Sequence, residues 1–295
     1  MSWNRFGGEP VPTAHLGIRY AEPPVGPLRL RPPVDCDGEP AGRFGDAHTL
    51  NVWTAAGGPA PVLLWVHGGA NTVGSSAQPE YAGDVLASHG VVFVSCNYRL
   101  ARDGYGVVEG FPHNRGLLDV VSALRWIRRN IRGYGGDPGN VTVAGQSSGA
   151  QTVASLMVMP LARGLFHRAV AHSLAGRFFT PEEAAEVQRA GEPGVVHYQP
   201  VVDGDTLPRS PLVGPYGVDL LVCHTEDEDA ELFQRPTTRL AGEHGRAFRS
   251  VYARTPAHHG ADVPDMFRGD IAAAWAGFAR DGDPGWPRDQ VKRWV

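Results

Sequence analysis

The sequence lacks the charge pattern and the long apolar runs that would point to nucleic acid or a membrane. It has 27 Lys and Arg against 31 Asp and Glu, and Lys292 is its only lysine. A net charge of -4 gives no broad cationic surface for nucleic acid or anionic lipid. No apolar run is long enough to span a bilayer, and Met1 to Gly8 contain no apolar core of a signal peptide. We therefore expect a neutral small-molecule substrate, no nucleic-acid or membrane partner, and a cytoplasmic location.

Cysteine is also scarce. Cys36, Cys96 and Cys223 are an odd set without C-x-x-C spacing. Cys96 and Cys223 lie in apolar runs that are typical of strands, so we expect buried free thiols. The pair His258 and His259 is followed by Asp262, but this spacing is not a zinc pattern. The sequence thus predicts no metal site and no cofactor.

What the sequence does have is an alternation of strand and helix patterns over 295 residues, of which 42% are hydrophobic. This favours a single α/β domain over residues 1–295, with a central, mostly parallel sheet flanked by helices. Residues 1–48 are rich in Pro and Gly and are expected to wrap the domain as extended chain. Strands are predicted at 49–54, 61–67, 91–98, 141–144, 166–172, 219–224 and 250–254. The last two are expected to be the final strands, and a turn is predicted at 135–139. Helices are predicted around 81–90 and 117–131, from 150 until Pro160, from 181 onward, and at 271–281.

The most informative stretch is Gly145-Gln-Ser147-Ser-Gly149, which follows a β-branched run and leads into an apolar-periodic helix. A G-x-S-x-G turn between a strand and a helix holds its serine in a strained conformation at the edge of a parallel sheet. We therefore predict that Ser147 is a nucleophile.

A serine nucleophile needs a histidine base and an acid to orient that base, and in this kind of fold they follow the serine in the order acid, then histidine. His244 falls in a helical stretch, whereas His258 and His259 lie in the loop after the last predicted strand, where Gly260 gives backbone freedom. We choose His259 over His258. The acid is expected in the loop after 219–224, and spacing alone does not choose among Glu226, Asp227, Glu228, Asp229 and Glu231.

The oxyanion of a tetrahedral intermediate needs N–H donors. His67-Gly68-Gly69 ends a central strand, and glycines let the backbone approach a substrate oxygen. We predict donors at Gly68, Gly69 and Ser148, the last being the residue after the nucleophile.

Together these stretches resemble the type-B carboxylesterase family of α/β-hydrolases. The signatures that carry the resemblance lie at residues 16–33, 50–54, 67–76, 97–100, 135–142 and 145–149. The resemblance implies that Ser147 is the nucleophile and His259 the base. It selects Glu228 as the acid, with Asp229 second, and places the oxyanion hole at Gly68, Gly69 and Ser148. The hormone-sensitive-lipase group fits the length better but does not explain the proline-rich N-terminal signature.

The sequence also departs from that family. Regions 34–45, 176–195 and 234–248 look shortened, which implies a reduced cap and lid over the site. Ser148 replaces the usual alanine, Cys223 replaces a glycine, and the cysteine expected near Ala47 is missing, so its disulfide cannot form. We expect a serine carboxylesterase that acts on small esters through an acyl-enzyme. The alternatives are a catalytically silent binding module, a truncated relic, or a homodimer that covers exposed core.

Overall fold

The computed structural model describes residues 11–38, 46–55 and 57–295. The expectation for Met1 to Gly8 and most of the shortened stretch 34–45 lie outside these residues. Within the described residues, no helix is both long and apolar enough to be a candidate membrane span.

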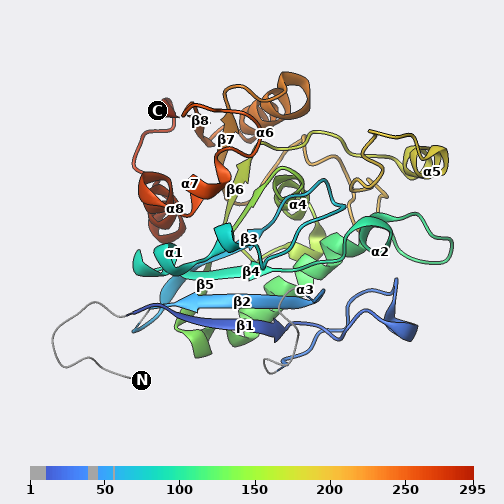
Figure 1. Ribbon diagram of the computed structural model, residues 1–295, viewed down its shortest axis with the longest axis horizontal. Helices are drawn as coiled ribbons and strands as arrows, with labels where there is room; N and C mark the ends of the chain where they lie inside the picture. The colour runs from blue at the N-terminus through green and yellow to red at the C-terminus, as the bar shows by residue number, and fades with distance from the viewer. Residues whose placement is uncertain (1–10, 39–45, 56) are drawn as a thin grey trace.

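The described strands are β1 (Thr13–Arg19), β2 (Thr49–Thr54), β3 (Ala60–Val66), β4 (Val92–Cys96), β5 (Gly136–Gln146), β6 (Arg168–His172), β7 (Asp219–Thr225), β8 (Phe248–Tyr252) and β9 (Val291–Trp294). They form one sheet in the order β1-β2-β4-β3-β5-β6-β7-β8-β9 (Figure 1). The pairings of β2 with β1 and with β4 are antiparallel, and the other pairings are parallel, so the sheet is mostly parallel as predicted.

The described α-helices are α1 (Asp84–Ser88), α2 (Ala101–Tyr105), α3 (Arg115–Asn130), α4 (Ser148–Leu156), α5 (Pro181–Ala190), α6 (Arg235–His244), α7 (Val263–Met266) and α8 (Gly269–Asp281). Short helical turns are η1 (Gly26–Leu28), η2 (Pro79–Tyr81), η3 (Ile131–Tyr134), η4 (Pro160–Ala162) and η5 (Ala230–Gln234), the last a π-helical turn.

Helices cover both faces of the sheet, because its central strands are apolar on both sides. Val62, Leu64 and Val66 of β3 pack with α3, α4 and α6, whereas Leu63 and Trp65 pack with α1, α7 and α8 on the other face. In Figure 1, α5 lies at the right edge of the molecule, away from α8 at the left.

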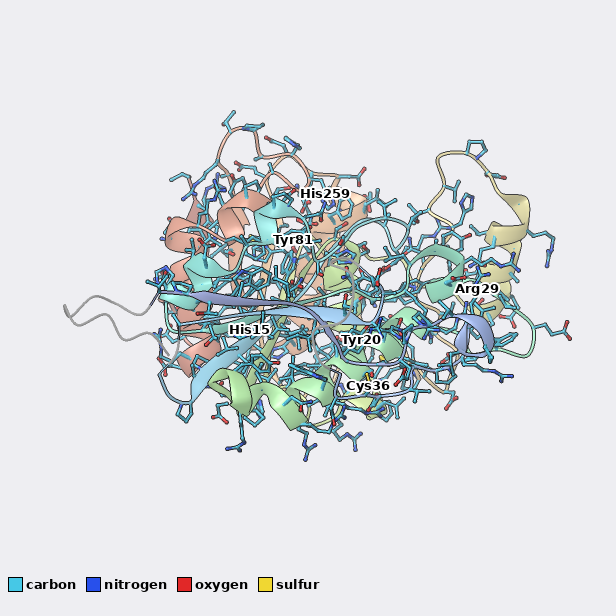
Figure 2. The ribbon with its side chains drawn as sticks, turned by 60° about the horizontal axis from the view of Figure 1, so that its bottom comes forward. His15, Tyr20, Arg29, Cys36, Tyr81 and His259 are labelled. Atoms are coloured by element: carbon cyan, nitrogen blue, oxygen red, sulfur yellow. The ribbon has the colours of Figure 1, made fainter. Side chains whose placement is uncertain are left out.

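The predicted wrapping segment is present, and we call residues 20–38 the N-terminal strap. Its Arg31 carbonyl accepts a hydrogen bond of 2.8 Å from Arg99, whose guanidinium is paired with the fully buried Asp119. The Asp35 carboxylate accepts a hydrogen bond from Ser122 of α3. In Figure 2, Cys36 lies toward the bottom of the molecule and His259 toward the top. The strap therefore fastens the end of β4 and α3 and does not line the region of His259.

Three expectations about the sheet were wrong. Residues 13–19 form β1 and are not part of an extended wrap. The pairing of β1 with β2 shifts register between His15 and Ile18, where Gly17 has φ +71°. The sequence of β1 therefore shows no regular alternation of apolar and polar residues. The strand at 248–252 is not the last, because β9 pairs beside it through four mostly exposed residues. Residues 136–139 of the predicted turn belong to β5, where Gly136 pairs with Ala60.

Other predictions from local patterns were confirmed. Helix α5 begins with the predicted capping box, in which Thr180 accepts from the Glu183 N–H and the Glu183 carboxylate accepts from the Thr180 N–H. Helix α8 ends at Gly282, which is left-handed with φ +76°. Cys96 and Cys223 are buried free thiols, whereas Cys36 is partly exposed.

Candidate active site

Ser147 lies on the sharp turn between β5 and α4 at the carboxyl edge of the sheet. Its backbone has φ 57° and ψ -121°, a strained conformation for a residue with a side chain. A Cβ on Gly145 would lie 2.5 Å from the Gly149 carbonyl carbon, and one on Gly149 would lie 2.1 Å from the Val66 carbonyl oxygen. Only glycine therefore lets β5, α4 and β3 approach so closely around the serine.

Two loops farther along the chain bring an imidazole and a carboxylate to Ser147. The Nε2 atom of His259 lies 3.0 Å from the Ser147 Oγ, and its Nδ1 atom lies 2.7 Å from Glu228 Oε2. The Glu228 side chain is fully buried and also accepts a 3.0 Å hydrogen bond from the Thr225 N–H. The three side chains thus form one continuous hydrogen-bonded chain.

The neighbouring alternatives are placed differently. Asp229 is exposed, and its carboxylate accepts hydrogen bonds from the N–H groups of Glu231 and Leu232 at the start of η5. Glu226 is exposed and pairs with Arg293. His258 is exposed, whereas His259 is partly buried.

The predicted oxyanion loop lies against the serine. A Cβ on Gly68 would lie 3.2 Å from the Ser147 Cβ, and Gly69 has φ +121° with the Val73 carbonyl oxygen only 1.9 Å from an added Cβ. Within the described parts of the chain, the Gly68 and Gly69 N–H groups donate no hydrogen bond. The Ser148 N–H is in the first turn of α4, where N–H groups have no partner inside the helix.

His67 stabilises this loop from beneath. Its Nδ1–H donates to the Gly68 carbonyl at 2.8 Å, and its ring stacks on Tyr98 with centroids 4.6 Å apart. Tyr98 in turn donates a 2.7 Å hydrogen bond to the His67 carbonyl. Burial lowers the pKa of His67 from 6.5 to about 4, so the ring is neutral near pH 7. The predicted oxyanion loop therefore packs on an uncharged imidazole.

Two residues around His259 were not found from the sequence. The Gln146 Nε2 lies 3.4 Å from the His259 Nε2, and the Phe233 ring stacks on the imidazole with centroids 3.8 Å apart. Gln146 could have been noticed, because it directly precedes the serine. Phe233 carries no such signal, since its position depends on the π-helical turn η5.

The catalytic candidates lie outside two large hollows of the described structure. One, of about 810 Å³, is lined by residues such as Met157, Phe166 and Tyr216 at the far end of α4. The other, of about 560 Å³, lies around Phe248 and Trp286. Ser147 and His259 are both partly exposed, so both side chains are in contact with solvent.

Asp262 does not group with His258 and His259. It is fully buried, and its carboxylate Oδ2 lies 3.1 Å from Nδ1 of His172 on β6. Among the described residues, His172, Cys223 and Asp262 are the one group whose ligand atoms are close enough to hold a metal ion.

The family model and the similar proteins found by comparison all belong to the carboxylesterases or related esterases. A model described as "Carboxylesterase family" matches residues 43–187. The para-nitrobenzyl esterase of Bacillus subtilis is 32% identical over 286 residues, covering 72% of this chain and 58% of that protein. The fumonisin B1 esterase of Sphingopyxis macrogoltabida is 34% identical over 318 residues, covering 88% and 58%. The chain thus spans little more than half the length of these two relatives.

Solved structures agree. A PNB esterase structure has a TM-score of 0.83 at 26% identity and covers 95% of this chain and 89% of that one. A Geobacillus stearothermophilus carboxylesterase has a TM-score of 0.84 at 26% identity and covers 100% and 91%. From its motifs, its sheet and these relatives, the chain belongs to the type-B carboxylesterase family and has the α/β-hydrolase fold.

Proposed function

We propose that the protein hydrolyses small carboxylic esters through an acyl-enzyme, with Ser147 as nucleophile, His259 as general base and acid, and Glu228 as the orienting acid. The observation that carries this proposal is the hydrogen-bonded chain from Ser147 Oγ through His259 to Glu228, with separations of 3.0 and 2.7 Å. Such a chain raises the nucleophilicity of a serine hydroxyl that is otherwise weak.

In the first half of the reaction, the Ser147 Oγ attacks the ester carbonyl carbon while its proton moves to the His259 Nε2. The resulting imidazolium is stabilised by the Glu228 carboxylate. The tetrahedral oxyanion accepts hydrogen bonds from the N–H groups of Gly68, Gly69 and Ser148. When the intermediate collapses, the bond to the alcohol oxygen breaks and His259 returns its proton to that oxygen, which leaves Ser147 acylated.

Water completes the cycle. It gives a proton to the His259 Nε2 as its oxygen attacks the acyl carbon, and the second tetrahedral intermediate is held by the same N–H groups. Its collapse breaks the bond to Ser147 Oγ, which regains the proton, and releases the carboxylic acid.

The shortened segments 176–195 and 234–248, which imply a reduced cap over the site, support small acyl groups as substrates. A reduced cap leaves less apolar surface on which a long acyl chain can be buried. We therefore propose a preference for acetyl and butyryl esters over long-chain esters.

The test compares the purified protein with Ser147→Ala on para-nitrophenyl acetate and butyrate, after circular dichroism has shown that both are folded. Turnover by the parent alone, with faster rates on the short acyl chains of a series, is the expected result. Equal inactivity of two folded proteins would refute the esterase proposal and favour a silent binding module. A preference for long acyl chains would refute the proposal about size.

A further inference from the structure

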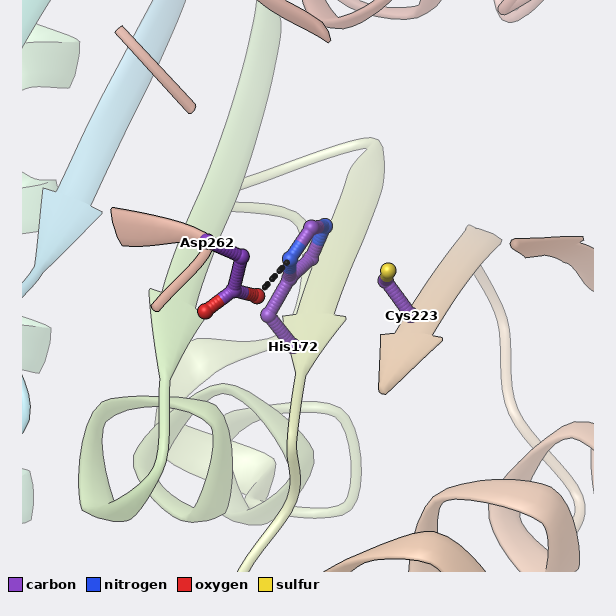
Figure 3. A group of neighbouring side chains, drawn as sticks. All are labelled: His172, Cys223 and Asp262. Carbon is purple, nitrogen blue, oxygen red and sulfur yellow. Dashed lines mark hydrogen bonds and ion pairs between the residues drawn. The ribbon is translucent and has the colours of Figure 1, made fainter. Parts of the chain in front are cut away.

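The strongest unexplained feature is the buried group of His172, Cys223 and Asp262, which we call the H-C-D cluster (Figure 3). His172 and Cys223 are register partners on the neighbouring parallel strands β6 and β7. Asp262 comes from the segment just after His259. All three side chains are at most 1% exposed. Three different metal-binding groups thus meet in the interior, apart from the residues proposed for ester hydrolysis.

The distances suit a single ion. The ligand atoms all lie within 4.8 Å of one another, and the His172 Nδ1 is 3.1 Å from the Asp262 Oδ2. Two ligands about 2.0–2.1 Å from a tetrahedral zinc ion are about 3.3 Å apart, so these two atoms need to move little. The Cys223 sulfur, with its longer bond of about 2.3 Å, must move inward by no more than roughly 1 Å.

The hydrogen bonding of the cluster is also incomplete. Within the described residues, the His172 Nε2 and the Asp262 Oδ1 are buried and have no hydrogen-bond partner. A buried polar atom without a partner costs about 1–3 kcal/mol, and Asp262 Oδ1, on the same carboxylate as Oδ2, has capacity for an ion that the protein alone does not use. The cluster is shielded by Trp275, whose ring lies edge-on to His172 with centroids 5.0 Å apart.

The charges and the donor types point to the kind of ion. A thiolate, a carboxylate and a neutral imidazole carry two negative charges, which a divalent cation neutralises inside the protein. A site with sulfur, nitrogen and oxygen donors suits zinc and similar borderline metals and does not suit magnesium or calcium.

We propose that the H-C-D cluster is a binding site for a divalent transition-metal ion of the zinc class. Binding releases the thiol proton of Cys223, because cysteine binds a metal as the thiolate. The ion would join two segments that carry catalytic candidates and a third, β6, that contacts Ser147. The His172 carbonyl accepts a 2.9 Å hydrogen bond from the Ser147 N–H, Cys223 precedes Glu228 on the same segment, and Asp262 follows His259. The expected role is therefore to stabilise the fold beneath Ser147 and His259. This proposal does not depend on ester hydrolysis.

The test measures bound metal directly. The protein is treated with a chelator, unfolded in guanidinium, refolded with zinc chloride and desalted, so that burial of the cluster does not prevent entry. Cys223→Ala removes one ligand, and His172→Gln removes another. Cys96→Ala is the matched control, because Cys96 is also a buried free thiol but lies on β4, outside the cluster.

We expect the parent and Cys96→Ala to retain one more zinc ion per chain than Cys223→Ala and His172→Gln. Refolding with cobalt(II) should give a thiolate-to-metal charge-transfer band in the parent and in Cys96→Ala only. Zinc should raise the thermal midpoint of these two proteins alone, since a ligand that binds the native state stabilises it. Equal zinc content in the parent and Cys223→Ala, or cobalt binding without the thiolate band, would overturn the proposal. The cluster would then only hold Asp262 in place through its hydrogen bond to His172. If His172→Gln does not fold, the comparison of Cys223→Ala with Cys96→Ala decides.

Discussion

Glu228 offers the sharpest test of how the site works. Its carboxylate is buried and accepts from His259 Nδ1 and from the Thr225 N–H. In the proposed mechanism, His259 takes the serine proton, and a positive charge forms beside that carboxylate. At a charge separation of about 4 Å and an effective dielectric constant of about 20, the attraction is about 4 kcal/mol. This energy is present in the transition state and nearly absent before proton transfer.

Replacing Glu228 with Gln removes the charge while nearly preserving shape. The amide oxygen of the new side chain still accepts from the Thr225 N–H, but its NH₂ group then faces His259 Nδ1 and favours the wrong tautomer. A loss of about 4 kcal/mol corresponds to a decrease in kcat of about 10³-fold. We expect this decrease with para-nitrophenyl acetate and only a small change in KM.

Asp229→Asn is the matched control, because Asp229 is the neighbouring acid and Asn also caps helical turns well. Its carboxylate is exposed and contacts only the start of η5 in the hydrogen bonds of the described residues. We expect kcat to be unchanged in this variant. The reasoning is refuted if folded Glu228→Gln loses less than about tenfold, or if Asp229→Asn loses as much as Glu228→Gln.

The surroundings of the site give three further predictions. First, the pKa of His67 is about 4 in the folded protein and 6.5 in a free histidine, so the unfolded chain binds more protons between these pH values. The free energy of unfolding therefore decreases by up to about 3 kcal/mol as the pH falls through this window. Urea unfolding from pH 7.5 to 4 should show a flatter dependence for His67→Gln, and identical slopes would contradict the assignment. Second, Gly149→Ala places a Cβ 2.1 Å from the Val66 carbonyl oxygen and should cost about 1–3 kcal/mol or more, whereas Gly133→Ala, with nothing within 4 Å, should be nearly neutral. Thermal midpoints measure this difference, and equal midpoints would show that α4 can shift freely. Third, Phe233→Leu removes the ring stacked on His259, an interaction of about 0.5–1.5 kcal/mol, and should lower kcat by about 2- to 12-fold. An unchanged kcat in the folded variant would mean that Phe233 does not position the imidazole.

The parts of the fold that local pattern determines could be predicted from the sequence. The apolar runs of β3, β4 and β7 are buried on both faces, and they appear in the sequence as continuous hydrophobic segments. The capping box at Thr180 and the glycine at 282 are likewise local signals. Strand β1 contains a register shift and β9 is short, exposed and charged, so neither has a local pattern.

The candidate site was predicted to a different extent. Chain order and turn chemistry were enough to propose Ser147 and His259, but Glu228 was selected from its neighbours only through a family motif. The structure brings these three side chains together, and their catalytic roles stay predictions. The contacts of Phe233 and Asp262 depend on how separate loops pack, and no spacing in the sequence indicates them.

The contact between Gly149 and β3 has a consequence for how such a protein can diverge. Because the α4 backbone presses against the Val66 carbonyl, the serine turn and the loop at Gly68 and Gly69 are fixed to one rigid body. Segments such as the one that carries α5 lie outside this contact and connect to the sheet only at strand ends. Natural variation can therefore lengthen or shorten these segments, and so change which molecules reach the serine, without altering the spacing of the reacting groups.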